Sequence, residues 1–268
     1  STMLRVANCL LGEDLGDDTL IIGTSGRYEF KNKGIDVFLE SLNRLNRDKD
    51  LKKKVLAFVN VPSWVGDPRE DLQKRLKSKD KFTEPLQCPF ITHWLHNMTH
   101  DQVLDMLKYL GMGNRPEDKV KVIFVPCYQD GHDGILNKHY YDLILGEDLS
   151  VYPSYYEPWG YTPLESVAFR VPTITTDLAG FGLWVNSLKN QHGINDGVEV
   201  LHRSDYNYSE VADGIKDTVA LFSTKTEAEI KEIRKRAGQV AEQALWKHFI
   251  QYYYEAYDIA LRNAMKRQ

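Results

Sequence analysis

Tyr155-Tyr156-Glu157-Pro158-Trp159-Gly160-Tyr161-Thr162-Pro163-Leu164-Glu165 is the stretch of this chain that decides its fold. It follows a short apolar run, Leu149 to Tyr152, which is typical of a buried strand. Its second half predicts a helix start, with Thr162 as the N-cap, Pro163 at the first helical position and Glu165 at the third, which would complete a capping box. A strand, a turn containing Gly160 and a helix N-terminus make an anion site, because free N–H groups and the helix dipole point forward.

Two carboxylates flank this predicted helix start, because Glu157 and Glu165 stand eight positions apart. Anion-binding amides and carboxylates at one strand end suit a ligand that combines phosphate with hydroxyl groups, and this favours a nucleotide sugar. Structural roles stay open for the same residues. Glu157 would bond N–H groups of its own turn, and Glu165 would only cap the helix. Tyr156 and Trp159 would be packing aromatics.

The composition is that of a globular protein, with 42% hydrophobic and 27% charged residues in a chain of 268. A formal net charge of −4 argues against a nucleic-acid-binding surface, which needs a basic excess. No apolar run is long enough to span a membrane and no signal peptide is recognisable, so we expect no membrane partner and a cytoplasmic location. Cys9, Cys88 and Cys127 fit no metal or redox pattern and are expected to be reduced thiols.

Apolar strand patterns alternate with amphipathic helix patterns along most of the chain. Strands are predicted at 20–25, 55–61, 119–126, 149–153 and 171–176, and helices at 35–45, 68–79, 139–145, 163–170, 209–222 and 226–263. Residues 1–19 are expected to be a lead-in, and 177–182 a loop. The alternation predicts an α/β fold, a Rossmann-like parallel sheet with helices on both faces, as one domain over residues 1–268. Ligands of such sheets bind beyond the carboxyl ends of the strands.

The segment from about 82 to 118 interrupts this alternation and is predicted to be a helical insertion. Its helix pattern places Val103, Leu104, Leu107 and Leu110 on one apolar face. This face would either mediate association between subunits or pack on its own domain, and the sequence leaves both alternatives open.

The loop Gly26-Arg27-Tyr28-Glu29-Phe30-Lys31-Asn32-Lys33-Gly34 places two cations, Arg27 and Lys33, six positions apart between a strand and a helix. Arginine offers phosphate a planar fork, and lysine offers a point charge. Cleavage of a sugar–diphosphate bond leaves negative charge on the departing oxygen, which preorganised cations stabilise more in the transition state than in the ground state. The alternative is a solvated loop with ordinary surface charges.

Metal binding has weak support, and neither a metal nor a cofactor is predicted. His93, His96 and His100 stand at spacings of three and four, so on a helix they would share a face. Pro89 and the mixed pattern argue against a continuous helix there, and packing or hydrogen bonding is the expectation. The basic run from Lys231 to Arg236 is expected to be the solvated face of a helix, with a phosphate-effector site as the alternative.

Several of these segments resemble glycogen synthases of the animal and fungal type. The most specific is Tyr155 to Pro163, and the two glutamates with seven intervening residues also mark retaining glycosyltransferases more widely. The other segments are Ser25 to Gly34, Phe90 to His93, Val122 to Phe124 and Val171 to Gly182. The likeness runs from about residue 20 to about residue 260 and covers the C-terminal half of those enzymes.

The resemblance implies the GT-B fold, in which two Rossmann-like domains face each other across a cleft. This chain is expected to carry only the second domain, which binds the nucleotide sugar, without the N-terminal acceptor domain. By resemblance, the catalytic residues are Arg27 and Lys33 at the donor diphosphate and Glu157 near the reacting sugar carbon. The implied substrate-binding residues are Tyr140 against the uracil, Trp159 and Gly160 beside the sugar, Tyr161 and Thr162 at the phosphates, and Glu165 on the ribose.

The implied activity is elongation of an α-1,4-glucan from UDP-glucose by a retaining glucosyltransferase without a metal. The α-glucan acceptor would bind through the missing domain, so the fragment is expected to be inactive alone. The insertion at 82–118 corresponds to the family's subunit-contact region and makes a homo-oligomer plausible. The basic helix is thinner than in the family, with Arg234 and Arg236 among lysines, which weakens the case for allosteric activation. Two alternatives stay open: a GT-B transferase that uses ADP-glucose or another nucleotide sugar, and a non-catalytic oligomerisation module.

Overall fold

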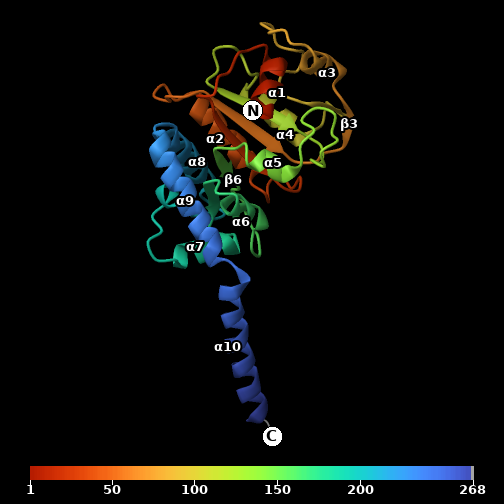
Figure 1. Ribbon diagram of the computed structural model, residues 1–268. Helices are drawn as coiled ribbons and strands as arrows, with labels where there is room; N and C mark the ends of the chain where they lie inside the picture. The colour runs from red at the N-terminus through yellow and green to blue at the C-terminus, as the bar shows by residue number, and fades with distance from the viewer. Residues whose placement is uncertain (267–268) are drawn as a thin grey trace.

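A six-stranded parallel sheet forms the centre of the computed structural model, which describes residues 1–266 (Figure 1). Its strands are β1 (Leu20–Ser25), β2 (Val55–Asn60), β5 (Val120–Val125), β6 (Leu149–Val151), β7 (Thr173–Thr176) and β8 (Val198–Leu201). They lie in the order β5-β2-β1-β6-β7-β8, and every neighbouring pair is parallel. The order changes direction between β1 and β6, so the sheet has a topological switch point there.

Helices cover both faces of this sheet (Figure 1). Adjacent strand residues point to opposite faces, and Ile22 of β1 packs with one set of helices while Ile21 packs with another. The first set is α2 (Ile35–Asn46), α4 (Gln102–Leu110) and α8 (Tyr208–Ser223). The second set is α1 (Thr2–Leu11), α3 (Glu70–Lys77) and α5 (Tyr140–Ile144). A third cluster packs α6 (Tyr161–Ala168), α7 (Gly180–Ser187) and α9 (Glu227–Gln243) with β8. The predicted α/β fold, a Rossmann-like parallel sheet with helices on both faces, is confirmed.

The N-terminal segment differs from its prediction as a lead-in. Residues 2–11 form helix α1, whose apolar residues recur at helical spacing and are mostly buried. They pack against Ile21, Phe58 and Ile123 of three neighbouring strands, so α1 belongs to the core. The prediction of a lead-in was wrong for residues 2–11 and fits only the acidic loop at 13–18. The helix ends before this loop at Gly12, which is left-handed with φ of 65°.

The segment 82–118 holds α4 and also a strand, β4 (His93–Leu95), which pairs antiparallel with β3 (Val65–Pro68). Asp101 caps α4 by accepting hydrogen bonds from the N–H groups of Val103 and Leu104. The apolar face of α4 joins the core shared with α2 and α8, where Val103 and Leu107 are almost fully buried. Of the two alternatives for this face, the structure therefore supports packing on its own domain.

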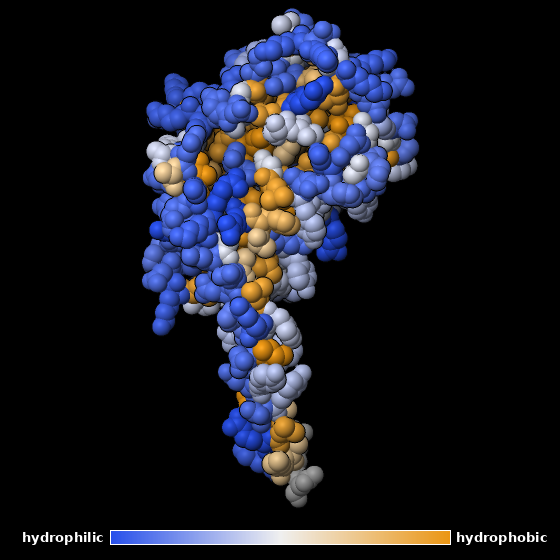
Figure 2. All heavy atoms as spheres, viewed as in Figure 1, coloured by the Kyte–Doolittle hydropathy of each residue, from blue (hydrophilic) through white to orange (hydrophobic). Residues whose placement is uncertain are grey.

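The predicted C-terminal segment 226–263 comprises two helices, because Ala244 and Leu245 interrupt it between α9 and α10 (Trp246–Met265). Helix α10 projects from the body of the molecule, and Figure 2 shows apolar side chains along it. None of its residues is buried. Its first turn is anchored by Phe249, whose ring lies 5.5 Å from that of Trp159 and 5.4 Å from that of Trp184. A short 3-10 helix (Ile194–Asp196) precedes β8.

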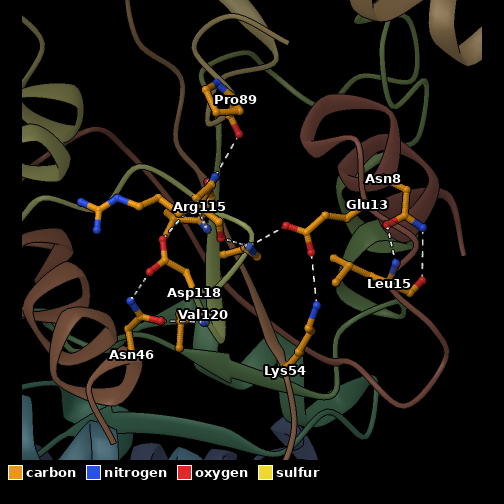
Figure 3. A network of polar contacts seen from close by, with 12 residues as sticks. Asn8, Glu13, Leu15, Asn46, Lys54, Pro89, Arg115, Asp118 and Val120 are labelled. Atoms are coloured by element: carbon orange, nitrogen blue, oxygen red, sulfur yellow. Dashed lines mark hydrogen bonds and ion pairs between the residues drawn. The ribbon is translucent and has the colours of Figure 1, made fainter. Parts of the chain in front are cut away.

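A buried cation ties the N-terminal segment to the sheet (Figure 3). The side chain of Lys121 in β5 is fully buried, and its Nζ lies 2.6 Å from Oε1 of Glu13. Lys121 also donates to the main-chain carbonyl of Arg115. The other oxygen of Glu13 pairs with the half-exposed Lys54 of the loop before β2 at 3.2 Å. A buried charge is tolerated only when it is paired and hydrogen-bonded, so Glu13 is the residue that allows Lys121 in this strand.

A buried carboxyl group lies beneath the switch point. Glu147 precedes β6 and accepts a hydrogen bond of 2.6 Å from Oγ of Ser150. Its carboxyl group packs against Gly23 of β1, where any side chain would collide with it. Burial raises the pKa of Glu147 to about 8, so the group binds a proton at neutral pH.

We expect Glu13→Gln to lower the free energy of unfolding by about 3–5 kcal/mol, because it leaves the Lys121 charge buried without a counter-ion. Lys54→Met is the matched control, since it removes the exposed partner of the same carboxylate and should cost about 1 kcal/mol or less. Urea denaturation measures both. Adding Lys121→Met to Glu13→Gln should recover most of the loss. Equal effects of the two single changes would contradict the assigned role of Glu13.

We expect the free energy of unfolding to fall as the pH rises from about 5 to about 8, because folded Glu147 retains a proton that the unfolded chain releases. A folded pKa raised above its ordinary value of 4.5 contributes stability at low pH that is lost as the pH passes through about 8. Glu147→Gln should remove this slope. Urea titrations of both proteins across the range test it, and parallel profiles would show that Glu147 is ionised in the fold.

Candidate functional site

Two loops meet at the switch point, and both were predicted to carry the site. Loop 26–34 leaves β1, and the loop after β6 approaches it closely enough for Tyr155 N–H to donate to the carbonyl of Asn32 at 2.7 Å. Gly34 permits this approach, because it is left-handed with φ of 67° and a side chain there would collide with the Pro153 carbonyl. The sheet topology and this glycine bring the two loop sequences together.

Lys33 and Glu157 form an ion pair between these loops, from Nζ to Oε1. The two side chains are 14% and 15% exposed, so the pair is largely shielded from solvent. The backbone of Glu157 is fixed as well, because its N–H donates to Leu178 at 3.2 Å and its carbonyl accepts from Gly180 N–H at 3.1 Å. The structure therefore holds a cation and a carboxylate, both predicted as catalytic, in one preorganised place.

Arg27 lies at the mouth of a neighbouring pocket of about 400 Å³. Its side chain is 77% exposed and pairs with Glu29 at 3.1 Å. The pocket walls include Ser25, Arg27, Asn60, Gln129, Tyr140 and Thr162. Three of the residues predicted for the site, from three different segments, thus line one cavity of the size that small ligands use.

Tyr140 is held rigidly in this pocket. Its hydroxyl group lies 3.1 Å from Oγ of Ser25, and its N–H donates to the carbonyl of Gln129 at 3.1 Å. Burial raises the pKa of Tyr140 well above its ordinary value, so the phenol stays neutral. The next residue, Tyr141, donates its hydroxyl proton to Glu165 at 3.2 Å.

The start of α6 differs from the prediction. The helix begins at Tyr161 with Gly160 as the N-cap, left-handed with φ of 102°, and no side chain caps it. The capping box of Thr162 and Glu165 was therefore wrong, because both residues lie inside the helix. Pro163 occupies the third helical position and has no N–H, so the free amides that open the helix are those of Tyr161 and Thr162.

The aromatic residues of the stretch from Tyr155 to Glu165 fall into two groups. The ring of Trp159 packs against Phe181 at 5.9 Å and against Trp184 and Phe249, so this side chain fixes α7 and the first turn of α10. The rings of Tyr156 and Tyr161 are mostly exposed. The carbonyl of Trp159 also accepts the N–H of Phe181 at 2.7 Å. Gly180 and Gly182 lie in the first turn of α7, whereas the sequence predicted a loop over 177–182.

A contact that the sequence did not indicate joins loop 26–34 to the segment 82–118. The hydroxyl group of Tyr28 donates to Oδ1 of Asp101 at 2.8 Å and accepts the N–H of Val103 at 2.9 Å. Ser63 donates to the other oxygen of Asp101 at 3.1 Å. The N-cap of α4 thus fixes the residue next to Arg27, and only the three-dimensional arrangement reveals the link.

The histidines predicted as weak metal candidates do not share a helix. His93 lies in β4, and its ring nitrogens contact Oγ1 of Thr92 and the carbonyl of Asp133, each at 2.8 Å. Cys127 and the carboxylate of Asp133 lie within 4.8 Å of the ring. The carboxylate already accepts three main-chain N–H groups of residues 135–137, so these potential ligand atoms are engaged in fixing the loop.

The strand order and the helices on both faces of the sheet define a Rossmann-like domain of the kind found in GT-B glycosyltransferases. A solved apo structure of OtsA matches with a TM-score of 0.52 at 12% identity, over 90% of this chain and 44% of that chain, and this likeness concerns the fold alone. A sequence model described as glycogen synthase matches residues 11–67 and 69–268. The chain therefore belongs to the glycogen synthase family, as the resemblance predicted.

Curated relatives agree with this assignment. The chain is 28% identical to glycogen [starch] synthase of Neurospora crassa over 92% of its own length and 42% of that protein. It is 29% identical to isoform 2 of Saccharomyces cerevisiae, over 94% of this chain and 44% of the relative. The chain thus spans less than half the length of these relatives. Within residues 1–266, no helix combines the length and apolarity that a membrane crossing requires.

Proposed function

We propose that this chain is the donor-binding part of a retaining glucosyltransferase that extends an α-1,4-glucan from UDP-glucose. The observation that carries the proposal is the ion pair of Lys33 with Glu157 at the switch point, beside a pocket whose walls include Arg27, Tyr140 and Thr162 of α6. Crevices at such a point are where open α/β sheets bind nucleotides. Membership of the glycogen synthase family supports glucose as the transferred sugar.

In the proposed reaction, the bond between the sugar carbon and the diphosphate oxygen breaks and leaves negative charge on that oxygen. Arg27 and Lys33, with the amides of Tyr161 and Thr162, would stabilise this charge without a metal. The Lys33 ammonium needs little reorganisation, because Glu157 already holds it in place. Glu157 would face the sugar near the reacting carbon, and its carboxylate would favour the positive charge that develops there.

The remaining predicted residues have places consistent with the nucleoside. Tyr140 would stack on the base, which its two anchoring hydrogen bonds allow without a loss of ring freedom on binding. Glu165 would accept hydrogen bonds from the ribose diol, and Tyr141 orients its carboxylate for that role. Gly160 and Trp159 would offer only their backbone, since the ring of Trp159 packs against α7 and α10.

The acceptor is proposed to bind in the part of the enzyme that corresponds to the unmatched portion of the relatives. A retaining transfer needs donor and acceptor held in one closed site. We therefore expect residues 1–268 to bind UDP weakly and to transfer no glucose alone. Incubation with radiolabelled UDP-glucose and glycogen tests this, and label in the polymer would contradict the proposed division of roles.

We expect calorimetry at millimolar nucleotide to detect UDP binding, and Arg27→Ala to weaken it about tenfold by removing a fork to the diphosphate. Lys31→Ala is the matched control, since it removes an exposed cation from the same loop outside the pocket walls. A folded protein that binds no UDP, or equal losses in the two variants, would count against the proposed site.

The choice of UDP over ADP is tested separately by the rise in melting temperature at equal nucleotide concentration. We expect UDP to protect more, because at equal concentration the nucleotide that binds the folded state more tightly stabilises it more. Greater protection by ADP would contradict UDP-glucose as the donor and would favour ADP-glucose. Light scattering of the same samples reports whether the chain forms a homo-oligomer.

A further inference from the structure

We infer that Arg203 is a positioning residue that holds Glu157 against Lys33 in the candidate site. Arg203 follows β8 by two residues, at the same edge of the parallel sheet as the loops of the site. The inference rests on the proposed function for its catalytic meaning, because the Lys33–Glu157 pair acts on a donor only if one binds there. The contacts that carry the inference all lie within the chain.

The side chain of Arg203 holds the segment that leads into Glu157. Nη1 of Arg203 donates a hydrogen bond to the main-chain carbonyl of Pro153, two residues after β6. Its Cζ lies 5.4 Å from the centre of the Tyr155 ring, within the range of a cation–π contact. One planar guanidinium therefore fixes two residues of this segment, a combination that the ammonium group of lysine does not offer.

The main chain of Arg203 holds the segment on the other side of Glu157. Its N–H donates to Oδ1 of Asp177 at 2.9 Å. Asp177 is followed by Leu178, whose carbonyl accepts the N–H of Glu157 at 3.2 Å. Arg203 thus contacts both the segment that precedes Glu157 and the segment that binds its backbone. Its position constrains the backbone from which this carboxylate projects.

Arg203 also lies against the loop that carries Lys33. A side chain at Gly34 would collide with the Pro153 carbonyl, and its Cβ would lie 3.0 Å from Nη1 of Arg203. The guanidinium, the carbonyl and Gly34 are therefore packed together. A residue at 203 that does not hold the carbonyl would leave the two loop backbones free to separate.

Burial strengthens the hold of the guanidinium on this carbonyl. Arg203 is only 6% exposed, and burial lowers its pKa, with Asp36 as the main charge that opposes the shift. Arginine nevertheless stays charged in proteins, so a desolvated positive charge lies at this place. Hydrogen bonds from a charged donor are roughly twice as strong as neutral ones, and a buried charge depends on them. The Pro153 carbonyl is therefore firmly held.

The test is the coupling between Lys33→Met and Glu157→Gln, measured without ligand by a double-mutant cycle in urea denaturation. We expect Arg203→Met to reduce this coupling to less than half its wild-type value, because Glu157 is no longer held within reach of Lys33. Arg69→Met is the matched control, since Arg69 is also fully buried and donates to main-chain carbonyls, but in the segment 82–118. This control should lower stability and leave the coupling unchanged.

A second measurement follows the proposed donor site. We expect Arg203→Met to weaken UDP binding about tenfold in calorimetry, because Lys33 is then no longer preorganised for the diphosphate. In a Lys33→Met background, Arg203→Met should have no further effect on the UDP affinity. A direct contribution of the Arg203 charge to binding would instead add to the loss caused by Lys33→Met.

The outcomes separate the two proposals. An unchanged coupling in Arg203→Met, an equal loss of coupling in Arg69→Met, or additive losses of UDP affinity would overturn the positioning role. A folded wild type that binds no UDP, with a coupling that depends on Arg203, would overturn the proposed function and leave the positioning role in place. If Arg203→Met does not fold, Arg203→Lys carries the test with a partial loss, because lysine keeps the charge but has no planar face for Tyr155.

Discussion

The close approach of two backbones at the switch point is the constraint on which the candidate site depends. The crossovers after β1 and β6 lead away from each other in this strand order, and the crevice between them is open. Gly34 lets the loop after β6 pass directly beside it, and the Tyr155–Asn32 hydrogen bond fixes that distance. Lys33 can reach Glu157 only because of this contact, so a backbone property sets the electrostatics of the site.

Local pattern predicted the parallel sheet and the loops that carry the site, because both depend on signals within a few residues: apolar runs, glycines and charged loop positions. The capping box failed for a tertiary reason. Hydrogen bonds from Gly180 and Phe181 to the Glu157 and Trp159 carbonyls pin the turn before α6, and Gly160 adopts the left-handed conformation that this position requires. The helix therefore starts at Tyr161, two residues before the predicted first helical position at Pro163, although the succession of strand, turn and helix is as expected.

Residues whose roles depend on distant partners escaped sequence reasoning. Asp101 is recognisable as an N-cap, yet nothing local indicates that Tyr28 completes its hydrogen bonding. In the sequence, Lys121 is one polar position in an ordinary alternation of polar and apolar residues. In the structure, the sheet buries its side chain and Glu13 neutralises its charge.

The observed start of α6 changes which groups would stabilise the negative charge in the proposed donor site. With Pro163 at the third position, the helix offers two free amides, so the side-chain cations must supply more of the stabilisation. Arg27 is largely exposed, and solvent weakens its field, whereas Lys33 is shielded and already oriented. In the proposed site, Lys33 would therefore stabilise the leaving charge more than Arg27 as long as the site is open. The contribution of Arg27 would become comparable only when bound substrate removes the water around it.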